Sequence, residues 1–458
     1  MDNNQKLEAK YGLFTAISMV IGQIIGSGIF FKVDDILTAT QGNIFAGFLG
    51  WLIVGLTVVF GAISMAFYAE LLPKDGGIIA YVNYRFGDKA AAYSGWLNMS
   101  LFYPMLTAVV FTVSGIYIAH LIAEFTSLTP TPLHFMLIGL VNLGIFFLVN
   151  VLSPKASGLF QQLTTVLKLI PLILISALAI IAFVGNDVPE ANTYAHSMSS
   201  VAEGQSILLL VGASFIPIAF AFDGWYIATQ ISGEIKDSKK NLPKALIIGT
   251  ITVLIVYLLY YTGIVYGMTN TEILTLQDTY ITEYARKIGS NLGAILMQIF
   301  IIISVLGTAN GLLLASTRVP YQFYNLEKSN KFFNLGKLSK RNNMPINSAI
   351  LGTIGIAFYI IIYYITNTNE FFTSKGFDLS AIPIVCIYMI NGMLFFGLLK
   401  LIKNNVFTGN KAIKYTLATV AIIGALLVLG GTASAANGIT YIVISIVYGL
   451  AGYFFIKK

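Results

Sequence analysis

Long apolar stretches with few or no charges constrain this 458-residue chain more than any other feature. A helix needs about 20 apolar residues to cross the hydrocarbon core of a bilayer. The stretches are too long for barrel strands, and they do not alternate polar with apolar residues. We therefore predict an all-α polytopic membrane protein with about 12 transmembrane helices. The expected spans cover residues 12–31, 43–71, 90–120, 134–152, 158–184, 205–232, 243–267, 289–316, 346–366, 379–399, 413–430 and 437–455.

Composition excludes a set of soluble domains. Only 10% of the residues are charged, whereas a soluble domain carries about 25%. The linkers between spans are short, so residues 1–458 are expected to form a single membrane domain. The first ten residues are polar and the first apolar run has full transmembrane length, so we expect no cleavable signal peptide.

The distribution of basic residues predicts the orientation. With the N-terminus placed inside, 22 of the 27 Lys and Arg residues fall in segments that face the cytoplasm, and four fall outside. Such a bias is typical of cytoplasmic loops. We expect a multi-pass protein of the plasma membrane with both termini in the cytoplasm, and the net charge of +7 then reflects topology.

Several kinds of chemistry are excluded. The single cysteine, Cys386, allows no intramolecular disulfide. The three histidines are scattered and have no metal-ligand spacing, so no metal is expected. No nucleotide-binding loop and no credible catalytic triad is present. We expect neither an enzyme nor a cofactor.

The first span contains Gly26-Ser27-Gly28 at its middle. Each glycine costs a helix about 1 kcal/mol relative to alanine. If the helix opens there, the freed N–H and C=O groups must face protein or a cavity, because lipid cannot satisfy them. Close helix packing through small residues is an equally good reading of this feature alone.

The sixth span is a stronger candidate for a broken helix. Pro217, Asp223 and Gly224 lie within eight residues near its middle. Proline removes a backbone donor and glycine loosens the helix. A buried carboxylate in a membrane is rare and marks a functional site by default. Asp223 could also merely cap the following helical half, a role compatible with lining a site.

The order of the two interrupted spans predicts an internal repeat. The first and sixth spans are equivalent if two five-helix units follow one another, and an odd number of crossings inverts the second. The predicted units are residues 12–184 and 205–399, with two extra helices in 413–455. In such transporters the paired broken helices hold the substrate near the midplane.

A lysine deep in the fifth span is the third unusual feature. Lys168 lies about ten residues into the span, roughly 15 Å deep at 1.5 Å per residue. Its ammonium must face protein or water, as a functional cation or in a structural ion pair with a partner such as Asp223. Pro171 would free a carbonyl nearby. In the eighth span, Ser304 and the segment 307–311 favour close packing, and contact of that segment with Lys168 is a further hypothesis.

Together these residues resemble a known family, the amino acid–polyamine–organocation superfamily, and within it the L-type amino acid transporter branch, mostly obligate exchangers. The resemblance covers most of the chain, in order. It is carried by the Ile-Ile-Gly-Ser-Gly-Ile-Phe run at 24–30, Phe-Ala-Phe-Asp-Gly-Trp at 220–225, Tyr68-Ala69-Glu70-Leu71 with Pro73, Gly76, Gly77 and Tyr81, Glu234 with Asn241-Leu242-Pro243-Lys244, and Ser316-Thr317-Arg318.

The resemblance implies a role for each matching residue. Backbone N–H groups around Ser27 and Gly28, with the Ser27 hydroxyl, would hold the substrate carboxylate. The carbonyls of Ile24, Phe220 and Asp223 would meet its amino group, and Phe220 would be the gate. Lys168, together with Ser304, would replace a sodium ion. The implied substrate-binding residues are Ile24, Gly26, Ser27, Gly28, Phe220, Ala221, Asp223, Gly224 and Trp225.

Two departures shape the expected function. Eukaryotic members of the family join a heavy chain through a cysteine between the third and fourth spans, but the loop 121–132 has none, so a stand-alone bacterial transporter is expected. Asp223 could attract a cationic side chain, or be neutralised by Lys168 and leave a site for small neutral amino acids. We favour a sodium-independent exchanger of small neutral amino acids. The alternatives are cationic substrates, a proton-coupled symporter and, from another class, a channel or receptor.

Overall fold

Helices form almost all of the regular structure in the computed structural model, which describes residues 11–72, 77–185, 188, 192–199, 206–327, 335–339, 344–435 and 437–452. Among these residues, extended pairing is confined to an isolated bridge between Tyr11 and Ile235. The prediction of an all-α membrane protein is confirmed. The predicted motif residues Pro73 and Gly76 and the end of the last span, 453–455, lie outside the described residues.

The elements of the first half follow the first five predicted spans. The described helices are α1 (Leu13–Ile24), α2 (Gly28–Phe31), α3 (Val33–Ala39), α4 (Ile44–Leu71), α5 (Ile78–Phe86), α6 (Asp88–Leu97), the π-helical turn η1 (Asn98–Phe102), α7 (Tyr103–Ala123), α8 (Pro132–Leu152), α9 (Pro154–Leu167), α10 (Leu169–Gly185) and α11 (Tyr194–Ser199).

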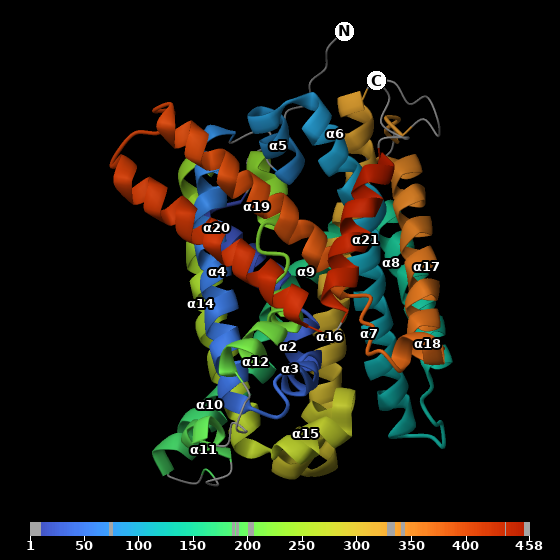
Figure 1. The fold of residues 1–458 in the computed structure, drawn as a ribbon. Coiled ribbons are helices and arrows are strands. Elements are labelled where there is room, and N and C mark those ends of the chain that lie inside the picture. The colour runs from blue at the N-terminus through green and yellow to red at the C-terminus, as the bar shows by residue number, and fades with distance from the viewer. Residues whose placement is uncertain are drawn as a thin grey trace.

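The second half continues the same pattern (Figure 1). Its elements are α12 (Ile207–Ala213), α13 (Phe215–Ala221), the 3₁₀ segment η3 (Ile227–Glu234), α14 (Ser238–Gly267), α15 (Asn270–Leu276), η4 (Gln277–Thr279), α16 (Tyr280–Glu327), α17 (Ile346–Thr368), α18 (Glu370–Thr373), α19 (Ala381–Lys403), α20 (Lys411–Ser434) and α21 (Gly438–Ala451).

Ten helices among the described residues are long and apolar enough to span a bilayer, and two shorter apolar helices, Ile207–Ala221 and Gly438–Ala451, stand at the predicted sixth and twelfth spans. The sixth span is shorter than predicted, because its α-helix ends at Ala221 instead of continuing to residue 232. The eighth span belongs to a longer helix, α16, that kinks at Gly289 and Ser290, where the predicted span begins. The division into two repeats stays a prediction.

Apolar side chains cover the outside of the bundle. Leu137, Val141, Ile145, Leu148 and Leu152 of α8 are all strongly exposed. Their spacing of three and four residues places them on one helix face. In water such a face would be a large unfavourable patch, whereas lipid tails solvate it. Helix α7 is instead mostly buried and forms part of the centre of the bundle.

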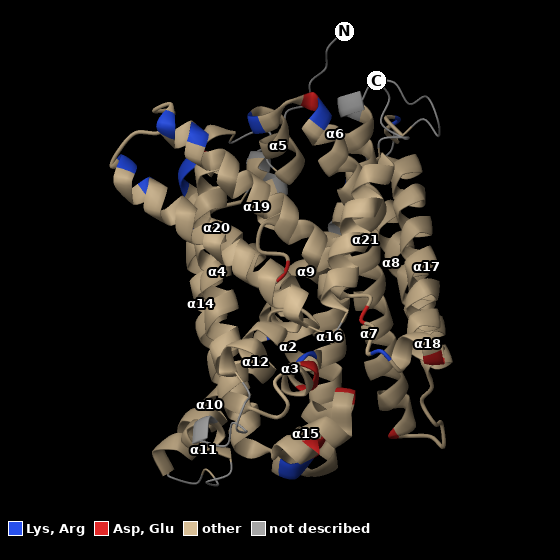
Figure 2. Ribbon diagram, viewed as in Figure 1, with Lys and Arg blue, Asp and Glu red and all other residues tan. Residues whose placement is uncertain are grey.

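Charged residues gather at the two ends of the bundle (Figure 2). One end, which we call the basic end, carries Lys and Arg residues of α5 and α6 and those around the α19–α20 loop. Helix α15 lies at the opposite end, and α3 and α18 lie in the same half of the bundle (Figure 1). Many of the described basic residues therefore share one end of the bundle, and the side of the membrane that this end faces stays a prediction.

The first, sixth and fifth spans are each interrupted within the bundle. Between α1 and α2, Ile25 is extended, with φ −71° and ψ 100°. After α13 the chain turns through residues 222–226 before η3 begins. Between α9 and α10 the helix loosens at Lys168, three residues before Pro171, which cannot donate a hydrogen bond to the preceding turn. The first two interruptions are the ones predicted from Gly26-Ser27-Gly28 and from Pro217, Asp223 and Gly224.

Candidate functional site

The two broken helices meet at the centre of the molecule, and glycines allow the contact. A Cβ on Gly28 would lie only 2.5 Å from the Cα of Ala221. Gly224 has φ +98°, and a Cβ there would approach the carbonyl oxygen of Gln23 to 3.0 Å. Gly28 brings α2 against α13, and Gly224 brings the second break against α1. A larger residue at either position would push the two breaks apart.

One tyrosine joins the two breaks. The hydroxyl of Tyr257, on α14, lies 3.1 Å from the carbonyl oxygen of Ile24 and 3.2 Å from that of Ala221. A phenol has one hydrogen to donate. It therefore satisfies one of these buried carbonyls at a time, and the other retains its capacity to accept a hydrogen bond. Tyr257 itself is fully buried.

Lys168 braces the first break from behind. Its Nζ donates to the carbonyl oxygens of Gly22 and Ile25, each at 2.6 Å, and to Oγ1 of Thr308 at 3.2 Å. The side chain is completely buried. The ammonium thus links the α9–α10 junction to α1 and to α16. The hypothesis that the segment 307–311 contacts Lys168 is confirmed by Thr308.

Helix α16 adds two hydroxyl groups to the same break. Thr308 Oγ1 lies 3.3 Å from the carbonyl oxygen of Ile25, and Ser304 Oγ lies 3.4 Å from that of Gly26. Gly307 lets α16 approach α9, since a Cβ there would meet the side chain of Thr164 at 2.4 Å. The carbonyls freed at the first break are therefore met by one ammonium and two hydroxyls.

The considered ion pair between Asp223 and Lys168 is not formed. Asp223 is buried, and its carboxylate accepts a hydrogen bond from the Tyr226 hydroxyl, at 3.1 Å from Oδ1 and 3.4 Å from Oδ2. The Lys168 ammonium is taken up by carbonyls of the first span and by Thr308. The backbone opened at the first break thus supplies the lysine's partners, and Asp223 keeps its carboxylate for another role.

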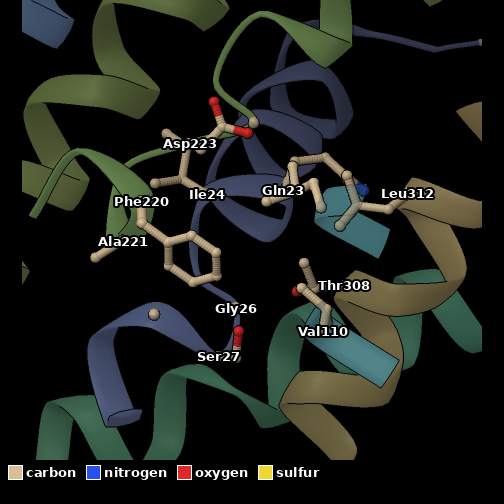
Figure 3. Close-up of a pocket in the computed structure, with 13 residues that line it drawn as sticks. Gln23, Ile24, Gly26, Ser27, Val110, Phe220, Ala221, Asp223, Thr308 and Leu312 are labelled. Atoms are coloured by element: carbon tan, nitrogen blue, oxygen red, sulfur yellow. The ribbon is translucent and has the colours of Figure 1, made fainter. Parts of the chain in front are cut away.

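A pocket lies between the two breaks (Figure 3). Backbone and side chains of both interrupted helices form one side, and α7 and α16 form the other. Phe220, which is 6% exposed, packs edge-on against Phe31, with ring centroids 6.2 Å apart. The lining residues are Gln23, Ile24, Gly26, Ser27, Gly28, Leu106, Val110, Phe220, Ala221, Asp223, Gly224, Thr308 and Leu312.

The structure brings the predicted substrate-binding residues together, with one exception. All of them line the pocket except Trp225. The Trp225 ring instead packs against the Tyr226 ring and lies beside Gly61 of α4. Lys168 and Ser304 do not line the pocket but support the backbone that does.

Sequence reasoning did not assign five of the lining residues to the pocket: Gln23, Leu106, Val110, Leu312 and Thr308, the last of which was expected only in the packing segment 307–311. The three apolar ones sit in ordinary apolar helices, and no local signal distinguishes them. Gln23 did carry a signal, since an amide in mid-span is uncommon. Its Oε1 is buried without a hydrogen-bond partner. Gly311 makes room for it, because a Cβ there would lie 2.5 Å from Nε2 of Gln23.

These features define a class of protein, a polytopic helical membrane protein in which two interrupted helices enclose a central, partly polar pocket. The family model described as amino acid permease matches residues 11–451. The chain therefore belongs to the amino acid permease family, in the amino acid–polyamine–organocation superfamily and its L-type branch. It is an amino acid transporter, and its relatives are transporters and not enzymes.

Individual relatives support the same placement. The chain is 28% identical over 463 residues to the serine/threonine exchanger SteT of Bacillus subtilis (strain 168), covering 100% of this chain and 98% of that protein. It is 27% identical over 316 residues to the large neutral amino acids transporter small subunit 2 of Homo sapiens, covering 68% of this chain and 57% of that protein. The b(0,+)-type amino acid transporter 1 of Rattus norvegicus is 26% identical over 317 residues, covering 69% of this chain and 62% of that protein.

Proposed function

We propose that this protein is a sodium-independent exchanger of small neutral L-amino acids that works by alternating access. The observation that carries the proposal is the Lys168 ammonium bound to the carbonyls of the first break, 2.6 Å from those of Gly22 and Ile25. In transporters with broken helices, unwound carbonyls of this kind coordinate a coupling sodium ion. Here a covalently attached cation fills that electrostatic role permanently, so no ion has to bind and leave in each cycle.

The pocket offers suitable groups for a zwitterion. The first N–H groups of a helix have no partner within that helix. Those that follow the break at Gly26 and Ser27 can hold a carboxylate, with the Ser27 hydroxyl as an additional donor. The carbonyl of Ile24 can accept from the substrate ammonium when Tyr257 donates to Ala221. The carbonyl of Phe220 already accepts from the backbone N–H of Asp223 at 3.1 Å, and its second lone pair can accept from the ammonium.

The walls of the pocket favour small neutral side chains. Leu106, Val110 and Leu312 are apolar, while Thr308 and Gln23 add polar groups. A relative that spans the whole chain is a serine/threonine exchanger. A cationic substrate is the second candidate, and the carboxylate of Asp223 favours it, because Lys168 does not neutralise that group.

We propose that the protein acts in the plasma membrane with the basic end in the cytoplasm. The described Lys and Arg residues concentrate at that end (Figure 2), in agreement with the rule for cytoplasmic loops. We also propose that it needs no disulfide-linked partner. Its single cysteine, Cys386, is only 1% exposed within α19.

Transport into liposomes tests the proposal. Purified protein is reconstituted in vesicles loaded with unlabelled serine, alanine, leucine, arginine or no amino acid, and uptake of radiolabelled serine is measured with and without sodium and a pH gradient. We expect uptake only into vesicles that contain a neutral amino acid, independent of sodium. Uptake into empty vesicles driven by protons would support a symporter, and strong exchange with arginine would support the cationic alternative.

A further inference from the structure

A buried lysine lies beside the pocket, on the side away from the basic end. Lys32 follows directly after α2 and is only 2% exposed. Its Nζ forms ion pairs with Oδ2 of Asp35 at 2.6 Å and with Oδ2 of Asp378 at 2.9 Å. Asp35 belongs to the same short stretch of chain, but Asp378 lies between α18 and α19, 346 positions away. The second pair therefore ties the first span to the tenth.

Asp378 is a firmly held partner. Its Oδ1 accepts from the backbone N–H of Ser380 at 2.8 Å, and its Oδ2 accepts from the Ser380 hydroxyl at 2.7 Å. Its own N–H donates to the hydroxyl of Tyr441, on α21, at 2.8 Å. The carboxylate that meets Lys32 is thus anchored to α19 and α21 and gives α2 a fixed point of attachment.

The Lys32 ammonium also contacts the aromatic rings next to the pocket. Its Nζ lies 4.6 Å from the ring centroid of Phe31 and 5.3 Å from that of Phe220. These distances are within the range of cation–π attraction. Phe220 lines the pocket. The Lys32 ammonium therefore contacts two groups at once. One is the Phe220 ring beside the pocket, and the other is Asp378 in the segment before α19.

The surrounding charges make this lysine hard to replace. Asp34 and Asp278 also interact electrostatically with Lys32, and Oδ1 of Asp34 is buried without a hydrogen-bond partner. Burial alone would lower the pKa of Lys32, but the carboxylates of Asp35 and Asp378 outweigh it, and the pKa lies above the ordinary value. Without the ammonium, several carboxylates would face one another across the contact between α2 and the α18–α19 segment.

We propose that Lys32 is a positioning residue for the outer gate: its ion pair with Asp378 latches α2 to the α18–α19 segment and holds Phe220 over the pocket. In alternating access, substrate also enters from the end opposite the basic end. On that route it must pass Phe31 and Phe220, which are both buried here. Opening that route separates α2 from the α18–α19 segment and must break the Lys32–Asp378 pair. This role of the Lys32–Asp378 pair in opening and closing rests on the proposed function, transport by alternating access.

Accessibility of the pocket tests the latch without a transport assay. In a Cys386→Ala background, Val110→Cys places a thiol in the pocket, where Val110 is 2% exposed. Cells are treated with a membrane-impermeant methanethiosulfonate reagent added outside, and the modification rate is measured. Lys32→Met and Asp378→Asn should each raise the rate by about tenfold, because each removes the ion pair that joins α2 to the α18–α19 segment. The double variant should raise it little further, since both changes break one contact.

Control variants separate a latch from general loosening. Lys32→Arg keeps the charge and should keep the slow rate. Lys375→Met removes an exposed lysine of the neighbouring segment, one that lies over the Phe371 ring, and should change nothing. Unchanged rates in both Lys32→Met and Asp378→Asn would overturn the proposal, as would additive effects in the double variant. If Lys32→Met does not fold, Asp378→Asn decides alone. A changed rate in a protein that exchanges no tested amino acid would overturn the proposed function and leave the latch standing.

Discussion

The two interrupted helices are held in different ways. At the first break, Lys168, Thr308 and Ser304 reach the carbonyls of residues 22, 25 and 26 from two other helices. At the second break the bonding is mostly local, with Tyr226 donating to Asp223 three residues before it. Tyr257 of α14 can donate to the carbonyl of Ile24 at the first break or to that of Ala221 at the second.

This difference indicates that the two breaks have different roles in substrate recognition and gating. The first break is cross-braced, so its backbone groups keep the positions needed to recognise the carboxylate and amino groups that all amino acids share. The second break has more local support and presents two side chains, Phe220 and Asp223, to the pocket. It is the better place for the movement of a gate and for selection among substrate side chains.

Removal of the brace at the first break should have the largest effect. Lys168→Ala removes the side-chain donor from the buried carbonyl of Gly22 and leaves that of Ile25 only the longer bond from Thr308, at about 1–3 kcal/mol for each lost bond, so exchange should fall by about 100-fold or more. Proteoliposome uptake measures this, with surface labelling to show that the protein still inserts. Lys400→Ala, which removes an exposed lysine at the basic end, is the matched control. Near-normal exchange by Lys168→Ala would reduce the lysine to a dispensable structural group.

Gly28→Ala, which should push the two breaks apart, should have the second largest effect. The Cβ added by Gly28→Ala would meet the backbone of Ala221 at 2.5 Å, and such overpacking costs about 1–3 kcal/mol. We expect lower thermal stability and loss of measurable substrate binding by calorimetry. Gly144→Ala on α8 meets no atom within 4 Å and should retain both. Substrate binding by Gly28→Ala at the native affinity would contradict direct contact between the breaks.

Loss of the shared hydroxyl should have a smaller effect. Tyr257→Phe removes a buried hydrogen bond worth about 1 kcal/mol and changes the groups that face the substrate ammonium, so the substrate Kd should rise by about five- to tenfold. Tyr261→Phe removes an equivalent buried bond, 3.1 Å from the carbonyl of Ile44 and away from the breaks. Both variants should lose similar stability, but only the first should change Kd.

Asp223→Asn tests the second break. If the carboxylate selects side chains, the substitution should abolish competition by arginine or lysine while neutral substrates compete within about threefold of the native level, a difference below 1 kcal/mol. Competition against labelled serine uptake measures both. Tyr226→Phe, which removes the hydroxyl held by Asp223, serves as the companion variant. A loss of neutral exchange as large as that of Lys168→Ala would show that the two breaks do not differ in role.

Ser27→Ala should have the smallest effect. The Ser27 hydroxyl supplements backbone N–H groups that remain in place, so substrate affinity should fall by only about two- to fivefold, the effect of one hydrogen bond of about 0.5–1 kcal/mol. Equilibrium binding measures the change. An unchanged affinity would mean that the backbone alone holds the carboxylate, whereas a loss of 100-fold would assign the hydroxyl a central part.

Much of this architecture could be predicted from local features. The apolar spans, the two breaks and the depth of Lys168 all follow from the cost of placing backbone or charge in lipid, which each segment bears wherever it packs. The partners of Lys168 could not be predicted in the same way. A lysine and an aspartate at similar depth looked like a natural pair, but the open backbone at Gly22 and Ile25 lies within reach of the ammonium and takes it instead.

The sequence by itself determined that the chain spans a membrane and that the first and sixth spans open near their middles. Only the tertiary structure decided how the pocket is completed and how its outer side is closed. Leu106, Val110 and Leu312 look like any other apolar residues of a span, and Lys32 looks like a loop lysine until Asp378, 346 positions away, is seen against it. The physical reason is that the solvation cost belongs to a segment, whereas contacts depend on how each helix is rotated and packed against its neighbours.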